Sequence, residues 1–284
     1  MNEAEFIAAL RRLPLHPGAR NLEDDCAVLE LGSETLVLTH DVMAEGTHFR
    51  EDADMADVAW KLVAVNLSDL AAKGSEPIGV LLGHSLSVGD ERFLVGLREA
   101  LETFAVPLLG GDTVNAEGSR SFGLTAIGRA THTPVPSRSG AQIGDAVYVT
   151  GKLGRAMLGF EGDLQHLEAF NRPCPLLAEG KALAGKVTAM MDVSDGLLLD
   201  AFRMAQASQA TFAIDSMAVP IADHNRREDC LRWGDDYELL FTLPDSVDSP
   251  VDCTRIGTIE PQGFGSLVLD GEAIVNGEGL GYQH

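Results

Sequence analysis

The chain has 284 residues, enough for one large or two ordinary domains, and 45% of them are hydrophobic, as in a packed globular protein. Asp and Glu number 43 against 21 Lys and Arg, and the formal charge of -22 argues against binding to nucleic acid or to an anionic membrane. No apolar run approaches the roughly 18 residues of a membrane span, the first residues read as an amphipathic helix rather than a signal peptide, and the four cysteines form no Cys-x-x-Cys pair. We therefore expect a cytoplasmic protein with reduced thiols.

Two acidic residues, Asp24 and Asp25, come directly before the first predicted strand, over 26–31. A second strand, over 35–38, follows a Gly-Ser turn, so the two strands can pair as a hairpin. That hairpin would bring Asp25 and Asp41 into neighbouring strands. A pair of acids before a strand is also a common turn sequence, and this reading stays open.

The second strand ends in Thr39, His40 and Asp41, which places a hydroxyl, an imidazole and a carboxylate together. His48 follows beyond Gly46, a residue that lets the backbone bend back toward the same place. Strand ends are where ligand sites tend to gather, so these side chains outline a metal or phosphate site. The alternative is that Asp41 is an ordinary turn residue.

A largely buried helix is predicted over 52–74, with Asp57 as its N-cap. One face of this helix carries an apolar line: Val58, Leu62 and Val65. One more turn along the same line reaches Asp69, so we expect this carboxylate to have a cation or strong hydrogen-bond donors as partners. Satisfaction by nearby backbone or by Lys73 is the competing explanation.

A strand and a helix are predicted next, over 78–87 and 90–104. A short apolar strand then runs into Gly110 and Gly111, and Asp112 follows as another acid at a strand end. Two glycines allow a backbone to approach a phosphate closely, and the carboxylate can hold the accompanying metal ion. A plain turn explains the same residues.

A strand over 121–130 precedes the best linker candidate, 131–140, which is dense in Pro, Ser and Thr. We place the domain boundary in this segment and predict an N-terminal domain over 1–133 and a C-terminal domain over 134–284. Arg138 lies in the linker, where its guanidinium can reach phosphate oxygens across a cleft between the domains.

The second half begins with a predicted strand, a glycine turn and a helix, over 146–150, 151–154 and 155–162. It contains neither a Walker A pattern nor a complete Gly-x-Gly-x-x-Gly fingerprint, so nucleotide binding would need another arrangement. Asp192, Ser194 and Asp195 offer one, because they precede a predicted helix whose N-terminal N–H groups favour a phosphate. Asp and Ser are also ordinary N-caps. A further acid, Asp235, precedes an apolar strand.

Six aspartates share one setting, the end of a strand or helix beside Gly, Ser or Thr: Asp25, Asp41, Asp69, Asp112, Asp192 and Asp195. Magnesium prefers such oxygen ligands and often joins carboxylates to substrate phosphates. Phosphoryl transfer is the reaction that fits best, because it depends mainly on alignment and charge neutralisation. The sequence shows no Gly-x-Ser-x-Gly or His-Glu-x-x-His motif to indicate a hydrolase or a zinc enzyme.

Seven segments occur in the order seen in the thiamine-monophosphate kinase family: Leu-Glu-Asp-Asp-Cys-Ala-Val-Leu, Thr-His-Asp-Val-Met-Ala-Glu-Gly-Thr-His-Phe, Ala-Val-Asn-Leu-Ser-Asp-Leu-Ala-Ala-Lys-Gly, Leu-Gly-Gly-Asp-Thr, Ser-Arg-Ser-Gly-Ala, Met-Asp-Val-Ser-Asp-Gly-Leu and Gly-Asp-Asp-Tyr-Glu-Leu-Leu-Phe. The chain resembles this family over nearly its whole length. The resemblance implies an α/β (α+β) fold like that of aminoimidazole ribonucleotide synthase, with two domains. It also implies a homodimer in which the N-terminal sheets of two subunits pair into an intersubunit barrel.

The resemblance also implies a reaction: direct in-line transfer of the γ-phosphate of ATP to thiamine monophosphate. Several Mg²⁺ ions would be cofactors, and K⁺ is a further candidate cofactor. The metal-binding positions would be Asp25, Thr39, His40, Asp41, Asp69, Asp112, Asp192 and Asp195. The ATP-binding positions would be Gly111, Asp112, Arg138 and Ser194. The positions that contact the acceptor would be His48, Asp235 and Tyr282.

The chain departs from the family pattern at several positions. His40 stands where the family usually has Thr, and Glu23 and Trp233 each replace a usual Gly. A terminal aromatic residue that would stack on the substrate ring is missing after His284, and Tyr282 is the candidate substitute. Two alternatives follow: another synthase of the same superfamily, or a catalytically inactive protein that binds magnesium and nucleotide.

Overall fold

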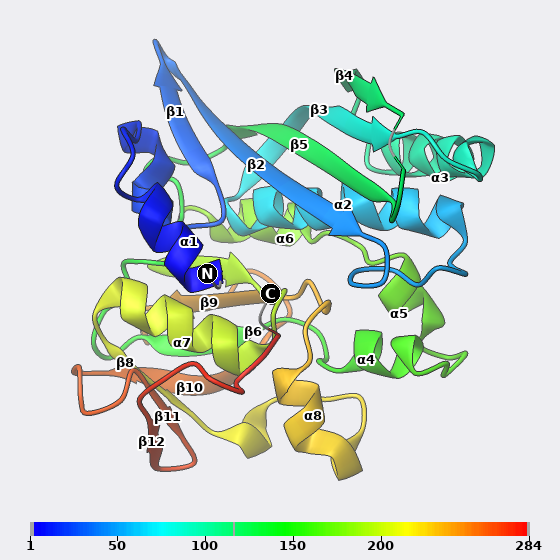
Figure 1. Cartoon of the computed structure of the whole chain (residues 1–284). Helices are drawn as coiled ribbons and strands as arrows, with labels where there is room; N and C mark the ends of the chain where they lie inside the picture. Colours follow the sequence, from blue (N-terminus) through cyan, green and yellow to red (C-terminus); the bar gives the residue numbers. More distant parts are fainter. Residues whose placement is uncertain (1–2, 116, 283–284) are drawn as a thin grey trace.

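The chain folds around two mixed β-sheets, one in each half of the sequence (Figure 1). A computed structural model describes residues 3–115 and 117–282. The first sheet has the strand order β1 (Ala27–Leu31), β2 (Glu34–Ala44), β5 (Ser121–Ala130), β3 (Ser75–Ser85) and β4 (Leu108–Val114). The second has the order β12 (Glu272–Ile274), β11 (Leu267–Leu269), β8 (Thr211–Ile214), β10 (Thr254–Glu260), β6 (Ala146–Val149), β9 (Leu239–Leu243) and β7 (Ala189–Asp192).

The helices lie beside and between these sheets: α1 (Glu3–Leu10), α2 (Met55–Ala72), α3 (Asp90–Thr103), α4 (Arg155–Phe160), α5 (Leu167–Asn171), α6 (Leu177–Leu183), α7 (Leu197–Ser208) and α8 (Arg227–Arg232). Among the residues described, no helix is long and apolar enough to cross a membrane. A loop over 131–145 joins β5 of the first sheet to β6 of the second. The proposed division into domains 1–133 and 134–284 remains a prediction.

The predicted hairpin is confirmed, because β1 pairs antiparallel with β2, with Ala27 opposite Leu38. The second strand runs further than predicted, to Ala44, so Asp41 lies inside it rather than at its end. In a strand, successive side chains point to opposite faces, so Thr39 and Asp41 share one face and His40 occupies the other.

Helix α2 is the long helix predicted before β3, and nearly all of its residues are buried. Its N-cap is Asp54, whose carboxylate accepts a hydrogen bond from the amide of Ala56. The prediction of Asp57 as N-cap was therefore wrong, because the helix begins three residues earlier. Asp57 lies in the first turn, where its carboxylate pairs with Arg172. In Figure 1, α2 and α6 lie between the two sheets, and α2 contacts strands of both.

Three groups of buried apolar side chains hold these elements together. The first packs α2 and α3 against the first sheet and includes Leu62, Leu67, Phe93, Phe122 and Leu124. The second packs α7 against the second sheet and includes Val147, Leu198, Phe202, Phe212 and Leu240. The third lies where the halves meet: Ala72, Leu183, Met190, Leu239, Phe241 and Leu243. Because Ala72 ends α2 and Met190 lies in β7, apolar packing fixes α2 against the second half of the chain.

The face of the first sheet opposite α2 exposes apolar side chains. Val42 and Leu81 are 48% and 38% exposed on this face, and every residue of the edge strand β4 is exposed. Gly110, Gly111 and Asp112 lie within β4, so the prediction that they follow a strand was wrong. A Cβ atom on Gly111 would lie 1.9 Å from the carbonyl oxygen of Leu82 in β3, and this contact is a structural reason for glycine at that position.

Candidate phosphoryl-transfer site

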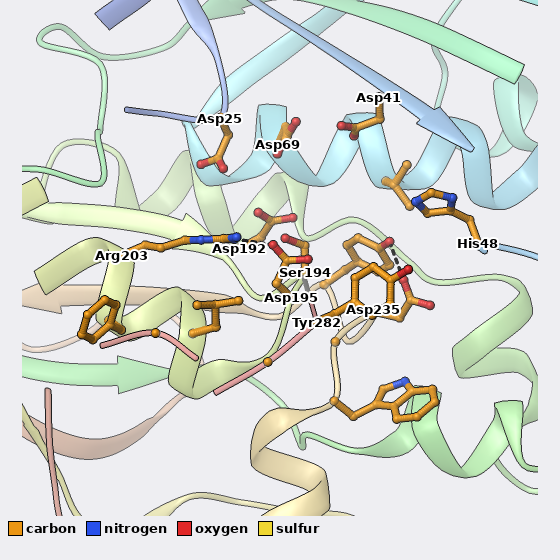
Figure 2. Close-up of a pocket in the computed structure, with 18 of the residues that line it drawn as sticks. Asp25, Asp41, His48, Asp69, Asp192, Ser194, Asp195, Arg203, Asp235 and Tyr282 are labelled. Atoms are coloured by element: carbon orange, nitrogen blue, oxygen red, sulfur yellow. Dashed lines mark hydrogen bonds and ion pairs between the residues drawn. The ribbon is translucent and has the colours of Figure 1, made fainter. Parts of the chain in front are cut away.

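A cavity of about 1590 Å³ lies where the two halves of the chain face each other (Figure 2). Ten of the predicted site residues line it: Asp25, Asp41, His48, Asp69, Arg138, Asp192, Ser194, Asp195, Asp235 and Tyr282. A site for one small molecule usually has a volume of about 300–1,000 Å³, so this cavity has room for two ligands. The fold thus brings together side chains that are separated by more than 250 positions in the sequence, from Asp25 to Tyr282.

Three carboxylates in the cavity are close enough to hold a common cation. Asp25, Asp69 and Asp192 each present an oxygen within 4.8 Å of the others. Asp25 precedes β1, Asp69 lies in the last turn of α2, and Asp192 ends β7. We call these three residues the carboxylate cluster. They come from three elements in two halves of the chain, so the cluster exists only when both halves are packed together.

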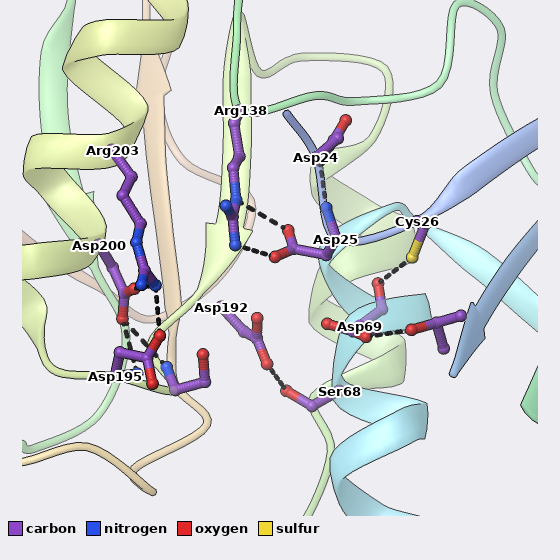
Figure 3. Close-up of polar contacts among 12 residues, drawn as sticks. Asp24, Asp25, Cys26, Ser68, Asp69, Arg138, Asp192, Asp195, Asp200 and Arg203 are labelled. Carbon is purple, nitrogen blue, oxygen red and sulfur yellow. Dashed lines mark hydrogen bonds and ion pairs between the residues drawn. The ribbon is translucent and has the colours of Figure 1, made fainter. Parts of the chain in front are cut away.

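Two hydroxyl groups orient the carboxylate cluster. Thr39, which is buried on β2, donates a hydrogen bond to Asp69, and Ser68 donates one to Asp192 (Figure 3). The expectation that the buried Asp69 has a strong donor is therefore confirmed. Because Ser68 and Asp69 are neighbours on α2, this single turn positions two of the three carboxylates.

Asp25 is the member of the cluster that has cations as partners. Arg138 donates to its carboxylate, and the ammonium nitrogen of the buried Lys73 lies 3.1 Å from it. Figure 3 shows Arg138 reaching Asp25. Burial alone would raise the pKa of Asp25, but the charges of Arg138 and Lys73 outweigh burial and hold that pKa below its usual range. Asp25 is thus ionised before any metal ion binds.

Three other acids in the cavity, Asp41, Asp69 and Asp192, have raised pKa values. Burial, together with the charges of Asp192 and Asp25, raises the pKa of Asp41 to about 7. Burial and the charge of Asp25 raise the pKa of Asp192 to about 6. Burial and the charges of Asp41 and Asp192 raise the pKa of Asp69 well above its usual value. Such mutual repulsion among oxygen donors is relieved by a bound divalent cation, so the residues present fit magnesium.

The loop that carries Ser194 and Asp195 is fixed by its own helix. The amides of both residues donate to one carboxylate oxygen of Asp200, at 3.1 Å each. These two amides are therefore not free for a phosphate, whereas the first amides of α7 itself begin at Leu197. Arg203, one turn further along, pairs with Asp195 and lines the cavity (Figure 3). Its guanidinium is the cation nearest this end of the site.

The opposite end of the cavity is built around Asp235. One of its carboxylate oxygens lies 2.7 Å from the ammonium nitrogen of Lys61, and the other accepts from the hydroxyl group of Tyr237 at 2.9 Å. His48 lies on this side in Figure 2, and its Nδ1 accepts a hydrogen bond from the amide of Ala44. These contacts hold a carboxylate, an ammonium group and an imidazole beside the cavity.

Four predicted site residues do not line the cavity of the single chain: Thr39, His40, Gly111 and Asp112. His40 is exposed on the far face of β2, where its Nδ1 lies 2.9 Å from the hydroxyl oxygen of Thr125. The imidazole of His40 is thus not among the possible metal ligands that line the cavity of a single chain. Gly111 and Asp112 lie on the exposed strand β4 and do not line the cavity either.

Sequence reasoning gave no site role to several residues that organise the cavity: Lys61, Ser68, Lys73 and Arg203. Lys61 and Lys73 could have been recognised from the sequence, because Lys61 is a charged residue within the largely apolar helix α2 and Lys73 directly follows that helix as its C-cap. No local pattern distinguishes Ser68 or Arg203 from ordinary helix residues.

Comparisons with known proteins agree with this geometry. The chain matches two family models, the N-terminal domain of AIR synthase related protein over residues 23–130 and its C-terminal domain over 142–273. A thiamine-monophosphate kinase from Escherichia coli is 33% identical over 300 residues, covering 92% of this chain and 90% of its own. One from Salmonella typhimurium is 36% identical over 250 residues, covering 78% and 75%.

A solved structure, AaThiL complexed with AMPPCP and TMP, is similar over 100% of this chain and 97% of its own, with a TM-score of 0.88 and 29% identity. That protein therefore binds an ATP analogue and TMP on the same overall fold. Family models and relatives alike cover most of the present chain.

Proposed function

The chain belongs to the AIR synthase-related family and, within it, to the thiamine-monophosphate kinases, and we propose that it transfers the γ-phosphate of ATP to thiamine monophosphate. The product would be thiamine diphosphate. The observation that supports this most directly is the carboxylate cluster, which presents three hard oxygen donors within 4.8 Å in a cavity large enough for two ligands.

The metal ions in this proposal are several Mg²⁺ ions. Asp25, Asp69 and Asp192 would hold them, with Asp41 and Asp195 lining the same cavity. The chemistry that bound magnesium supplies is neutralisation of phosphate charge and alignment of the reacting oxygens. Thr39 acts through Asp69, because its hydroxyl orients that carboxylate.

We infer direct in-line transfer between the two substrates. This reaction needs positioning and charge stabilisation more than it needs a protein nucleophile. Arg138, Ser194 and Arg203 line the cavity near the carboxylate cluster and are the residues that would contact the phosphates of ATP. His48, Asp235 and Tyr282 would contact the acceptor. The two sets would bind the substrates at opposite ends of one cavity.

We further propose a homodimer formed through the first sheet. Its outward face exposes Val42 and Leu81, and such apolar surface is typical of an interface. The exposed edge strand β4 has free backbone groups along one side that could extend a sheet into a second subunit. In that arrangement Gly111 and Asp112 would line the cavity of the partner subunit, which would explain why they lie outside the cavity of their own chain.

The test of the proposed function is a transfer assay. Purified protein, ATP, Mg²⁺ and thiamine monophosphate are incubated at several K⁺ concentrations, and thiamine diphosphate and ADP are quantified by chromatography. We expect both products in equal amounts. If ATP binds but no thiamine diphosphate forms at any metal or K⁺ concentration, the chain is a nucleotide-binding protein of this family and not a kinase.

A further inference from the structure

An aromatic wall lines one side of the cavity and has no assigned role so far. It consists of Phe160 at the end of α4, Phe170 in α5 and Trp233 directly after α8. The ring centroids of Phe160 and Trp233 lie 5.2 Å apart with an interplanar angle of 40°, and those of Phe160 and Phe170 lie 5.3 Å apart at 67°. Three separate elements thus contribute one continuous group of packed rings.

Phe160 and Trp233 present part of their ring surface to the cavity. Phe160 is 37% exposed, although it contacts rings on two sides, whereas Phe170 behind it is 8% exposed. Trp233 is half-buried and packs on the apolar core of the second half with part of its indole. A ligand in the cavity would therefore cover apolar surface of Phe160 and Trp233 that otherwise contacts water.

Charged groups at one end of the aromatic wall indicate the chemical class of the ligand. The ammonium nitrogen of Lys61 lies 3.9 Å from the ring centroid of Phe170 and pairs with Asp235, whose side chain is 27% exposed. Aromatic faces attract cations and stack on flat rings, and a nearby carboxylate adds to the attraction for positive charge. The ammonium group of Lys61, in contrast, favours a phosphate. The combination fits a phosphate ester of a flat, positively charged heteroaromatic compound.

We propose that Trp233 and Phe160 bind the ring system of the phosphate acceptor and determine selectivity for a heteroaromatic cation. This inference rests on the proposed function, because the thiazolium ring of thiamine monophosphate is such a cation. It assigns the stacking role to an internal residue, Trp233, which sequence analysis identified only as a departure from the family pattern. Phe170 acts by supporting Phe160 and Lys61.

The kinetic test compares Trp233→Ala with Trp233→Phe and with Phe160→Ala. We expect Trp233→Ala to raise the KM for thiamine monophosphate about tenfold, which corresponds to ~1.4 kcal/mol, and to leave the KM for ATP within about twofold. Trp233→Phe should retain most of the affinity because it keeps an aromatic face. Phe264→Ala is the matched control, since Phe264 is 90% exposed and does not line the cavity.

A fluorescence test does not depend on turnover. The chain contains two tryptophans, so Trp60→Phe leaves Trp233 as the only indole. We expect thiamine monophosphate, and thiamine without a phosphate, to change the emission of this variant, while Trp233→Phe, which retains only Trp60, shows no change. Trp60 does not line the cavity.

The results distinguish the proposed kinase activity from the proposed ring-binding role of the aromatic wall. An active wild type in which Trp233→Ala and Phe160→Ala leave the KM for thiamine monophosphate unchanged would overturn the role of the aromatic wall alone. An unchanged emission of Trp60→Phe at saturating thiamine monophosphate would do the same if Trp233→Ala fails to fold. An inactive wild type whose Trp233 emission still responds to thiamine would contradict kinase activity and support the ring-binding role.

Discussion

The ammonium nitrogen of Lys73, a side chain with no exposed surface, lies 3.1 Å from a carboxylate oxygen of Asp25. Lys73 also pairs with Asp24, Asp24 with Arg20, and Asp25 with Arg138, so three cations and two carboxylates form a largely buried network beside the carboxylate cluster. Burial alone would lower the pKa of Lys73, but the charges of Asp24 and Asp25 raise it above its usual value. The network therefore links α2 to the segment before β1 and to the loop that enters the second half.

We predict that Lys73→Met destabilises the protein by about 3 kcal/mol, because it removes the buried cation that Asp24 and Asp25 share and leaves each carboxylate with one arginine partner. Urea unfolding followed by circular dichroism measures this loss. The control is Arg92→Met, which breaks an exposed ion pair with Asp54 and should cost less than about 1 kcal/mol. An equal effect of both substitutions would show that the buried network does not stabilise the fold.

The affinity for Mg²⁺ should rise with pH. Asp192 and Asp41, with pKa values of about 6 and about 7, must lose their protons before they can bind a metal ion, so binding is weak at pH 5.5 and strong at pH 8. Isothermal titration calorimetry of Mg²⁺ in buffers with different ionisation enthalpies should detect proton release near pH 6.5. An affinity that does not change between pH 5.5 and pH 8 would contradict the assignment of these carboxylates.

The same shifts predict the stability of the metal-free protein. Asp41 and Asp192 have higher pKa values in the folded chain than in the unfolded chain. At a pH between the unfolded-state and folded-state pKa of each residue, the folded state therefore binds more protons than the unfolded state. Their contribution to stability is present at low pH and is lost as the pH rises through about 6 to 7. The urea midpoint of metal-free wild type minus that of Asp41→Asn should therefore fall over this range, and Mg²⁺ should reverse the fall.

Asp69→Asn should lower the transferase activity without lowering the stability of the metal-free protein. The substitution removes a metal ligand, and we expect transferase activity to fall on the order of 100-fold or more. It also replaces a buried carboxyl group, whose ionised form burial and the charges of Asp41 and Asp192 disfavour, with a neutral amide, so the urea midpoint of the metal-free variant at pH 8 should not be below that of the wild type. Asp252→Asn changes an exposed acid and should alter neither quantity. An active Asp69→Asn variant would refute the carboxylate cluster as the metal site.

Leu81→Lys tests the proposed dimer. A lysine in the centre of the exposed apolar face should disfavour association by introducing a charge that must be desolvated. Sedimentation velocity should show a dimer for the wild type and a monomer for this variant, with circular dichroism unchanged. Phe264→Lys places the same charge at an exposed apolar residue outside the first sheet and should remain dimeric. A wild type that sediments as a monomer would contradict the proposal directly.

Asp112 can be assigned to its own cavity or to that of the partner by complementation. Asp69→Asn and Asp112→Asn subunits, each inactive alone, are co-expressed with different affinity tags and purified together. If Asp112 acts across the dimer, one of the two sites in each mixed dimer has both carboxylates, so about half of the sites are intact in dimers purified through both tags. If it acts within its own chain, no mixed dimer contains an intact site, and activity stays at the level of the single variants.

The sequence allowed prediction of those features that follow from local periodicity. The hairpin of β1 and β2 and the long helix α2 appear where apolar spacing indicated them, and the burial of Asp69 followed from its place on the apolar line. These predictions rest on contacts within a few turns or residues, where the spacing of side chains determines which face is buried.

Other features depend on contacts between distant segments and could not be predicted. The sequence offers Lys73 as a partner for Asp69, four residues away, but Lys73 pairs with Asp24 and Asp25, nearly fifty residues earlier. Likewise, the glycines at 110–111 indicated close approach to a phosphate or a plain turn, whereas a neighbouring strand in close contact accounts for Gly111. The aromatic wall unites three elements with no shared motif.

Helix α2 carries Lys61 at the acceptor end of the cavity and Asp69 at the carboxylate cluster, eight positions apart. At 1.5 Å per residue, the two are separated by about 12 Å along a single rigid rod. One helix thus fixes the distance along its axis between the acceptor end of the cavity and the carboxylate cluster.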